Sequence, residues 1–174
     1  MAPPPEQPPF RTGSGWDLHR LEPGLPLILA GVKVPSDRGC VAHSDGDVVF
    51  HAVTDALLGS LALGDIGRLF PDDDPANAGR DSAVFLDEAV RRVRAAGYEP
   101  VNLDVTVVLQ RPKLAGFAEA MRASLAQRLG VPVDRVSLKA KTHERVDAVG
   151  EGRAVSCQAA VLVASVSPPT PPAK

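Results

Sequence analysis

The sequence predicts an α+β fold in which a single mixed β-sheet carries helices packed on one face. Segments in which apolar and polar residues alternate indicate strands, and segments whose apolar residues recur three or four positions apart indicate helices. Along the chain these segments follow the order strand, strand, helix, helix, strand, helix, strand, strand. The length of 174 residues is typical of one domain.

Prolines are concentrated at the two ends of the chain. Nine of the seventeen lie within residues 3–9 and 168–172. Proline-rich segments are extended and do not build a packed core. We therefore expect disordered tails at residues 1–9 and 167–174 and a folded domain at residues 10–166.

The amino-terminal part of the domain predicts two extended segments and a helix. Residues 10–20 and 26–34 read as strands, because residues 21–24 carry Pro and Gly and form a turn between them. Apolar residues then recur at helical spacing from Asp47 to about Leu61. Asp45 is expected to cap the amino end of this helix.

A long loop separates that helix from the remaining elements. Residues 63–82 are rich in Gly, Pro and Asp, and loops of this length in compact domains are usually functional or disordered. The later segments predict helix 82–96, strand 101–109, helix 116–129, strand 135–141 and strand 155–165. All odd positions of strand 101–109 are apolar and should share one face, and the last strand is apolar enough to be central.

Composition excludes several classes of function. A net charge of −2 offers no basic surface to nucleic acid or to an anionic membrane, and aromatic residues are few. The chain has neither a long apolar run for a transmembrane helix nor a signal peptide at its start. Cys40 and Cys157 lie far apart, so we expect two reduced, buried thiols in a cytoplasmic protein that binds neither nucleic acid nor membrane.

The four histidines point to metal chemistry. Asp17 and His19 are two residues apart, so on a strand they point to the same side. With His51 from the first helix they supply three ligands of the kind that zinc prefers and leave a fourth position open, as in catalytic sites. Gly13 and Gly15 allow a close backbone approach. The alternative is that Asp17 and His19 form a structural hydrogen-bonded pair.

Further polar residues stand at element ends and suit anions. His43 and Ser44 precede the first helix, whose amino end favours phosphate; the alternative is a polar cap. Thr142 and Glu144 follow a strand and suit a phosphate and a hard cation such as magnesium. Four basic residues near strand ends could receive phosphates or could be solvated edge charges: Arg111, Lys113, Lys139 and Lys141.

Taken together, these segments form motifs in a recognisable order. The motifs are Gly13-x-Gly15-x-Asp17-x-His19, Gly39-x-x-x-His43-Ser44-Asp45-Gly46-Asp47, His51-Ala52-x-x-Asp55-Ala56-Leu57-Leu58-Gly59, Leu63-Gly64-Asp65-Ile66-Gly67, Phe70-Pro71-Asp72-x-Asp74-Pro75, Asp81-Ser82, Pro112-Lys113 and residues 139–144. Over residues 11–165 the sequence resembles the 2-C-methyl-D-erythritol 2,4-cyclodiphosphate synthase family of the non-mevalonate isoprenoid pathway.

The resemblance implies an activity and an assembly. It implies a homotrimer with active sites at the subunit interfaces. It implies a phosphorus–oxygen lyase that converts 4-diphosphocytidyl-2-C-methyl-D-erythritol 2-phosphate to the cyclic diphosphate and CMP. It also implies that the substrate's own 2-phosphate attacks the β-phosphate, so that catalysis depends on positioning and charge neutralisation.

The resemblance also implies roles for individual residues. Asp17, His19 and His51 match zinc ligands (or ligands of another divalent transition metal), and Glu144 matches the ligand of Mg²⁺ or Mn²⁺. His43 and Thr142 match residues that stabilise the transition state. The residues that match substrate contacts are Asp17, His19, His43, Ser44, Asp65, Ile66, Gly67, Phe70, Pro71, Asp72, Asp73, Asp74, Pro112, Lys113, Lys141, Thr142, His143 and Glu144.

The sequence departs from the family pattern at a few positions. Asp73 replaces a small hydroxylated residue, and Lys141 and His143 stand where threonine is frequent. Glu151 and Arg153 stand with their charges exchanged relative to the usual order. Two other hypotheses remain open at this stage: a zinc-dependent phosphohydrolase that uses water, and a trimeric binding or scaffold protein that kept the metal site.

Overall fold

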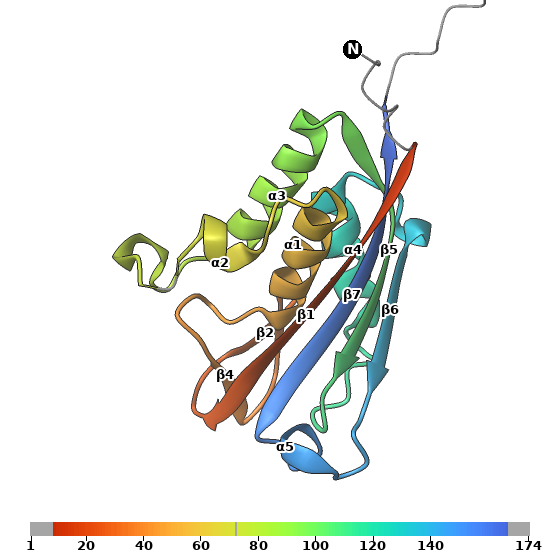
Figure 1. The fold of residues 1–174 in the computed structure, drawn as a ribbon. Helices are drawn as coiled ribbons and strands as arrows, with labels where there is room; N and C mark the ends of the chain where they lie inside the picture. Colours follow the sequence, from red (N-terminus) through yellow and green to blue (C-terminus); the bar gives the residue numbers. More distant parts are fainter. Residues whose placement is uncertain (1–8, 72, 167–174) are drawn as a thin grey trace, which may run out of the picture.

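The computed structural model describes residues 9–71 and 73–166. Most of the predicted tails, and Asp72, lie outside the described residues. A five-stranded sheet runs through the molecule in the order β4-β1-β7-β5-β6 (Figure 1). Its strands are β1 (Phe10–Pro23), β4 (Arg38–Val41), β5 (Tyr98–Val108), β6 (Val136–Lys141) and β7 (Ala154–Ser165). The sheet is mixed, because β5 and β6 are parallel and the other neighbours are antiparallel.

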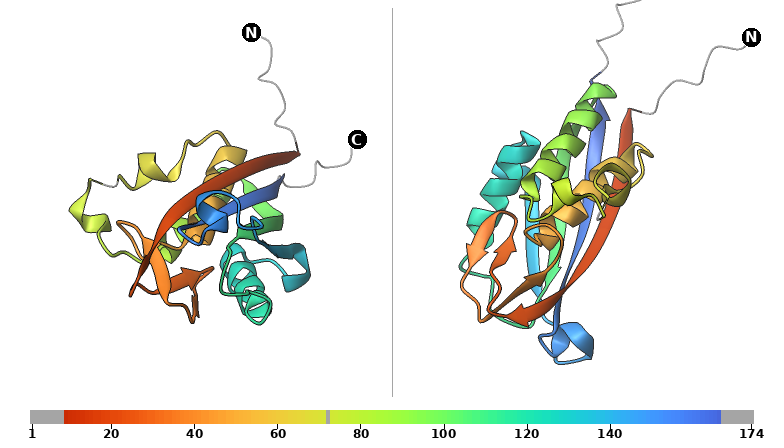
Figure 2. Two further views of the ribbon diagram at one scale, coloured as in Figure 1. Left: turned by 90° about the horizontal axis from the view of Figure 1, so that it is seen from below. Right: turned by 90° about the vertical axis from the view of Figure 1, so that its left-hand side faces the viewer.

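Helices cover one face of this sheet, as the sequence predicts. Figures 1 and 2 show α1, α3 and α4 side by side on that face. The α-helices are α1 (Val48–Ser60), α2 (Ile66–Leu69), α3 (Ala83–Ala95), α4 (Ala118–Leu129) and α5 (Asp147–Gly150), with 3₁₀ turns η1 (Pro75–Asn77) and η2 (Val133–Arg135). Every helix in the described part of the chain is too short or too polar to cross a bilayer.

The strand β7 is central, as its apolar sequence predicts. It pairs with β1 on one side and β5 on the other. Val155, Cys157 and Val161 of this strand are buried, and the strand packs against α1. Both cysteines of the chain are buried and unpaired, as expected. Burial in apolar surroundings raises the pKa of the Cys40 thiol to about 12.

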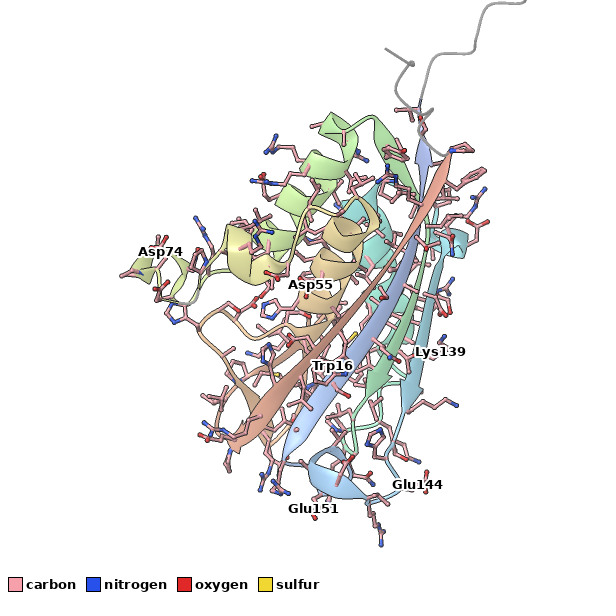
Figure 3. All side chains as sticks on the ribbon, in the orientation of Figure 1. Trp16, Asp55, Asp74, Lys139, Glu144 and Glu151 are labelled. Carbon is pink, nitrogen blue, oxygen red and sulfur yellow. The ribbon has the colours of Figure 1, made fainter. Side chains whose placement is uncertain are left out.

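The opposite face of the sheet is open and partly apolar. Trp16 and Phe10 are each 59% exposed and Leu18 is 42% exposed, although all three are large apolar side chains. They alternate along β1 with residues that face α1, so they lie on the face away from the helices. Figure 3 shows Trp16 on this side of the sheet. In a single chain this apolar surface faces water.

The prediction of one extended segment at 26–34 was wrong. The chain forms a separate hairpin of β2 (Leu27–Leu29) and β3 (Val32–Val34). Ala30 and Gly31 turn the chain with φ angles of 53° and 74°. The carboxylate of Asp47 accepts hydrogen bonds from both of their N–H groups, at 2.9 and 2.6 Å. This turn depends on a residue far along the chain, which the local pattern does not reveal.

The predicted cap of the first helix was also wrong by two residues. Asp47, and not Asp45, caps α1, because its carboxylate accepts from the N–H groups of Val49 and Phe50 at 3.0 and 3.2 Å. Asp47 is fully buried, and this burial raises the pKa of its carboxyl to about 6 against the effect of its backbone donors. Asp45 instead contacts the side chain of Ser82.

Further elements differ from the sequence-based prediction, among them the short helices α5 and η2, which were not predicted. β4 was not predicted, because four residues are too few to show alternation. The loop at 63–82 contains α2 and η1, capped by the carboxylates of Asp65 and Asp74. β5 begins at Tyr98 and has a bulge between Pro100 and Asn102, which removes Val101 from the buried face.

Candidate metal centre and active site

Two glycines on β1 place this strand against α1. A Cβ atom on Gly13 would lie 1.9 Å from the carbonyl oxygen of Ala56, and one on Gly15 would lie 1.9 Å from that of Ala52. No side chain fits at these distances, so glycine permits a direct backbone contact between strand and helix. The contact brings the end of β1 beside the first turn of α1.

Three predicted metal ligands meet at this crossing. The Nδ1 atom of His51 lies 3.0 Å from Oδ2 of Asp17 and 3.0 Å from Nε2 of His19, and the last two atoms are 3.2 Å apart. A tetrahedral zinc ion with bonds of about 2.0–2.1 Å holds its ligand atoms roughly 3.3 Å apart. The three atoms therefore fit one divalent transition-metal ion with little rearrangement.

The electrostatics of the triad favour the forms that bind metal. Burial opposes ionisation of Asp17, but its interaction with His51 and the charges that both imidazoles acquire in acid outweigh burial, so the pKa of this carboxyl is lowered. Burial lowers the pKa of His19, and His51 adds to this effect while Asp17 opposes it. An ionised carboxylate and a neutral imidazole are the ligands that a metal requires.

A cavity of about 390 Å³ opens onto the triad. Its walls include five residues that the sequence analysis assigned to substrate or transition state: His43, Ser44, Ile66, Gly67 and Phe70. The side chains of the triad are 12–26% exposed, so a small molecule in the cavity can reach them. Mixed polar and apolar walls of this kind suit a small molecule that carries a few polar groups.

Sequence reasoning missed three residues of this cavity: Ala42, Asn77 and Phe85. The ring of Phe85 lies between those of His51 and Phe70, with centroids 5.9 and 4.5 Å away. Phe85 lies on the buried stripe of α3, where its position alone cannot be told from an ordinary core position. Asn77 donates to the carbonyl of Pro71, and only the unusual loop length pointed to its surroundings.

The loop above the cavity is anchored to α1. The carboxylate of Asp55, one turn after His51, accepts from the N–H of Ile66 at 2.8 Å. Burial raises the pKa of the Asp55 carboxyl, and this hydrogen bond opposes the shift. Farther along, Nε2 of His43 lies 3.4 Å from the carbonyl oxygen of Asp74. The side chains of Asp65, Pro71, Asp73 and Asp74 are exposed, and Figure 3 shows Asp74 at the tip of the projecting loop.

The other predicted site residues lie elsewhere. Pro112, Lys113, Lys141 and Thr142 line a second cavity of about 190 Å³, which has no residue in common with the first. Next to it, the hydroxyl of Thr142 donates to Glu144 at 2.8 Å. Figure 3 shows Glu144 on the side of the molecule away from Asp74. The predicted site residues of one chain therefore form two separate groups, one around the first cavity and one around the second, which we call the two half-sites.

Two further residues that the sequence analysis considered for substrate or phosphate binding, His143 and Lys139, contact acidic side chains of the protein itself. Nδ1 of His143 lies 2.9 Å from the carboxylate of Asp147. Lys139 forms an ion pair with Asp104 at 2.5 Å on the open face of the sheet. Of the two roles considered for Lys139, the structure favours the edge charge.

The fold and the site together define an α+β protein with three clustered side chains that can hold a divalent metal ion. Residues 10–164 match the sequence profile of the YgbB family. The chain belongs to this family.

Named relatives extend the comparison. The chloroplastic 2-C-methyl-D-erythritol 2,4-cyclodiphosphate synthase of Oryza sativa is 56% identical over 162 residues, which cover 93% of this chain and 73% of that protein. A solved structure of 2C-methyl-D-erythritol-2,4-cyclodiphosphate synthase with CDP bound has a TM-score of 0.82 and 46% identity, and covers 88% of this chain and 99% of its own. Bifunctional IspDF from Campylobacter jejuni has a TM-score of 0.86 and 38% identity over 90% of this chain, which spans only 42% of that longer protein.

Proposed function

We propose that this protein is a 2-C-methyl-D-erythritol 2,4-cyclodiphosphate synthase. It converts 4-diphosphocytidyl-2-C-methyl-D-erythritol 2-phosphate to the cyclic diphosphate and releases CMP, which makes it a phosphorus–oxygen lyase. The observation that carries this proposal is the triad of Asp17, His19 and His51 at the mouth of a cavity, in a chain of the YgbB family. The CDP-bound relative supports a small cytidine-containing substrate.

Two metal ions belong to the proposal. Asp17, His19 and His51 would hold Zn²⁺ or another divalent transition metal, which when bound supplies a Lewis acid for a phosphate oxygen. Glu144 offers an exposed carboxylate for Mg²⁺ or Mn²⁺, which typically bind one or two carboxylates together with substrate phosphates.

The side chains of the site position a substrate that carries its own nucleophile. The attacking oxygen belongs to the 2-phosphate, which is already anionic and needs no general base. His43 and Ser44 stand at the cavity wall beside the triad, where they can donate to phosphate oxygens. Holding the attacking phosphate close to the β-phosphate, with positive charge and donors around both, lowers the barrier.

The two half-sites support a homotrimer with active sites between subunits. Thr142 and Glu144 of one subunit would complete the metal half-site of the next, because they lie far from it within one chain. The open face of the sheet, with Phe10, Trp16 and Leu18 exposed, supplies apolar surface for such an interface.

The trimer can be tested on this face. Trp16→Glu is expected to shift the protein from three times the chain mass to the mass of one chain in sedimentation velocity, because a buried charge without a partner opposes association. Val84→Glu is the matched control, since Val84 is 42% exposed on α3, away from this face. A Trp16→Glu protein that sediments like the Val84→Glu protein would exclude the proposed interface.

Two residues argue against the phosphohydrolase hypothesis. A water-activating base would have to come from Asp47 or Asp55. Asp47 is fully buried beneath four backbone N–H donors, and Asp55 is engaged with the N–H of Ile66. Neither residue lines the cavity beside the triad, where a water molecule would have to be activated. Two buried free thiols also support the cytoplasm as the proposed compartment, although the rice relative is chloroplastic.

The identity of the products tests the function. We expect the protein, incubated with zinc, magnesium and 4-diphosphocytidyl-2-C-methyl-D-erythritol 2-phosphate, to yield CMP and a cyclic diphosphate in equal amounts by phosphorus NMR. CMP with a linear diphosphate would instead identify a hydrolase. A protein that binds zinc and leaves the substrate intact would be the scaffold of the third hypothesis.

A further inference from the structure

We propose that Ser82 is a positioning residue for the metal centre: together with Asp45 it fixes the proton of His51 on Nε2 and leaves Nδ1 free to bind metal. This inference rests on the proposed metal site. Ser82 is fully buried, and its Oγ lies 2.9 Å from Nε2 of His51. The same hydroxyl donates to the carboxylate of Asp45.

The position of Ser82 at the start of α3 does not explain the orientation of its hydroxyl group. It stands at the N-cap of α3, where a serine ordinarily accepts a hydrogen bond from a backbone N–H of the first turn. Here its side chain makes no capping bond. The carboxylate of Asp81 accepts from the N–H of Ala83 at 2.8 Å instead. The hydroxyl of Ser82 is therefore directed away from its own helix and toward His51.

On the Nε2 side of His51, the count of donors and acceptors fixes the direction of each bond. An ionised carboxylate only accepts, so the single hydroxyl proton of Ser82 goes to Asp45. Ser82 can then only accept from His51, which must carry its proton on Nε2. Asp45 is itself held in place, because its carboxylate also accepts from the N–H of Asp47 at 3.2 Å.

Ser44 belongs to the same network. Its Oγ lies 3.2 Å from Nε2 of His51 and 3.3 Å from Oγ of Ser82, while it accepts from the N–H of Gly46 at 3.2 Å. With its one proton Ser44 can donate to Ser82 or to a molecule in the cavity. The proton on Nε2 of His51 thus faces two hydroxyl oxygens.

The consequence lies on the other side of the ring. With the proton on Nε2, the lone pair of Nδ1 points at the position shared with Asp17 and His19, where in the metal-free protein an Nε2–H of His19 can donate to both Nδ1 and the Asp17 carboxylate. A histidine whose second nitrogen donates to an acceptor is held in one tautomer and one orientation, and loss of such a partner typically weakens metal binding about 10–100-fold. The Asp45–Ser82 pair therefore prepares His51 for metal before the metal arrives.

The first test reads the tautomer directly and needs no metal. Long-range ¹H–¹⁵N NMR on the metal-free, full-length protein should show neutral His51 protonated on Nε2. Ser82→Ala should give a mixture of the two tautomers, and Ser82→Thr, which keeps the hydroxyl, should restore the wild-type pattern. A wild-type His51 protonated on Nδ1, or a Ser82→Ala pattern identical to the wild type, would overturn the proposal.

The second test measures metal affinity by competition between the protein and a chelator, with Co²⁺ and its absorption spectrum as the probe. Ser82→Ala and Asp45→Ala, which removes the acceptor for the hydroxyl proton of Ser82, should each bind Co²⁺ about 10–100-fold more weakly than the wild type. Ser60→Ala is the matched control, because Ser60 is a buried serine on α1 that donates to the carbonyl of Leu57, away from the triad. Equal affinities in Ser82→Ala and Ser60→Ala would contradict the proposal.

The outcomes separate this inference from the proposed function. A wild-type protein that binds Co²⁺ and shows the expected tautomer, yet releases no CMP, would reject the synthase while the role of Ser82 stands. If the wild-type protein makes the cyclic diphosphate and Ser82→Ala binds metal with wild-type affinity, the proposed synthase activity stands and the proposed role of Ser82 is rejected.

Discussion

Replacing His51 with alanine is expected to lower kcat/KM for CMP release at least about 1000-fold, which corresponds to roughly 4 kcal/mol of transition-state stabilisation. His51 supplies one of three ligand atoms that lie within 3.2 Å of one another, and two ligands remain without it. A metal on Asp17 and His19 alone is held weakly and no longer in a fixed place.

The measurement combines steady-state kinetics with the metal content of the dialysed protein. Thr54→Ser is the control, because it removes only a methyl group from a buried position on the same helix and keeps the hydroxyl that donates to Phe50. Near-normal turnover in His51→Ala at low metal content would show that the triad is not the catalytic metal centre.

A single methyl group at Gly15 is expected to destabilise the fold by at least about 3 kcal/mol, the upper end of the usual range for overpacking. The added Cβ would lie 1.9 Å from the backbone oxygen of Ala52, which cannot rotate away as a side chain can. β1 and α1 must then separate. Their separation pulls Asp17 and His19 from His51, so metal affinity should fall in parallel with stability.

A glycine-to-alanine substitution at a second position of α1 near β1, Gly59, is expected to change the free energy of unfolding in the opposite direction. Gly59 is exposed on α1, and a Cβ there would meet nothing closer than the carbonyl oxygen of Ser14 at 3.7 Å. Gly59→Ala should stabilise the protein by about 0.5–1 kcal/mol, because alanine favours the helix. Urea unfolding of both variants and of the wild type measures these changes in the free energy of unfolding. Equal midpoints for Gly15→Ala and the wild type would refute the close contact.

Local patterns predicted the parts of the fold that depend on local interactions. The helix that ends at Leu129 is closed by Gly130 in the left-handed region, and β7 is central because nearly every residue of it is apolar. The β2–β3 hairpin could not be predicted, because its turn is held by Asp47, 16 and 17 residues away. Its sequence shows only a short apolar run, which is also consistent with one strand.

In the candidate site, too, some residues can be predicted from the sequence and others only from the packing of distant segments. Asp17, His19 and His51 can be predicted from residue type together with the family resemblance of their motifs, because the Asp17–His19 pair alone is also consistent with a structural hydrogen bond. Phe85 and Ser82 have sequence positions that indicate a core residue and a helix cap. Only the packing of α3 against α1 turns these two side chains toward His51.

The spacing of His51 and Asp55 on α1 couples metal binding at the triad to the position of the loop that follows this helix. One face of the helix carries the candidate metal ligand His51 and, one turn later, holds the 63–70 loop through Asp55 (Figure 3 labels Asp55). A displacement of this helix therefore alters both sites together. By thermodynamic reciprocity, the factor by which bound metal changes the affinity for a substrate held by the loop equals the factor by which that substrate changes the affinity for the metal. Metal affinities measured with and without a substrate analogue should thus differ by the same factor as substrate affinities measured with and without metal.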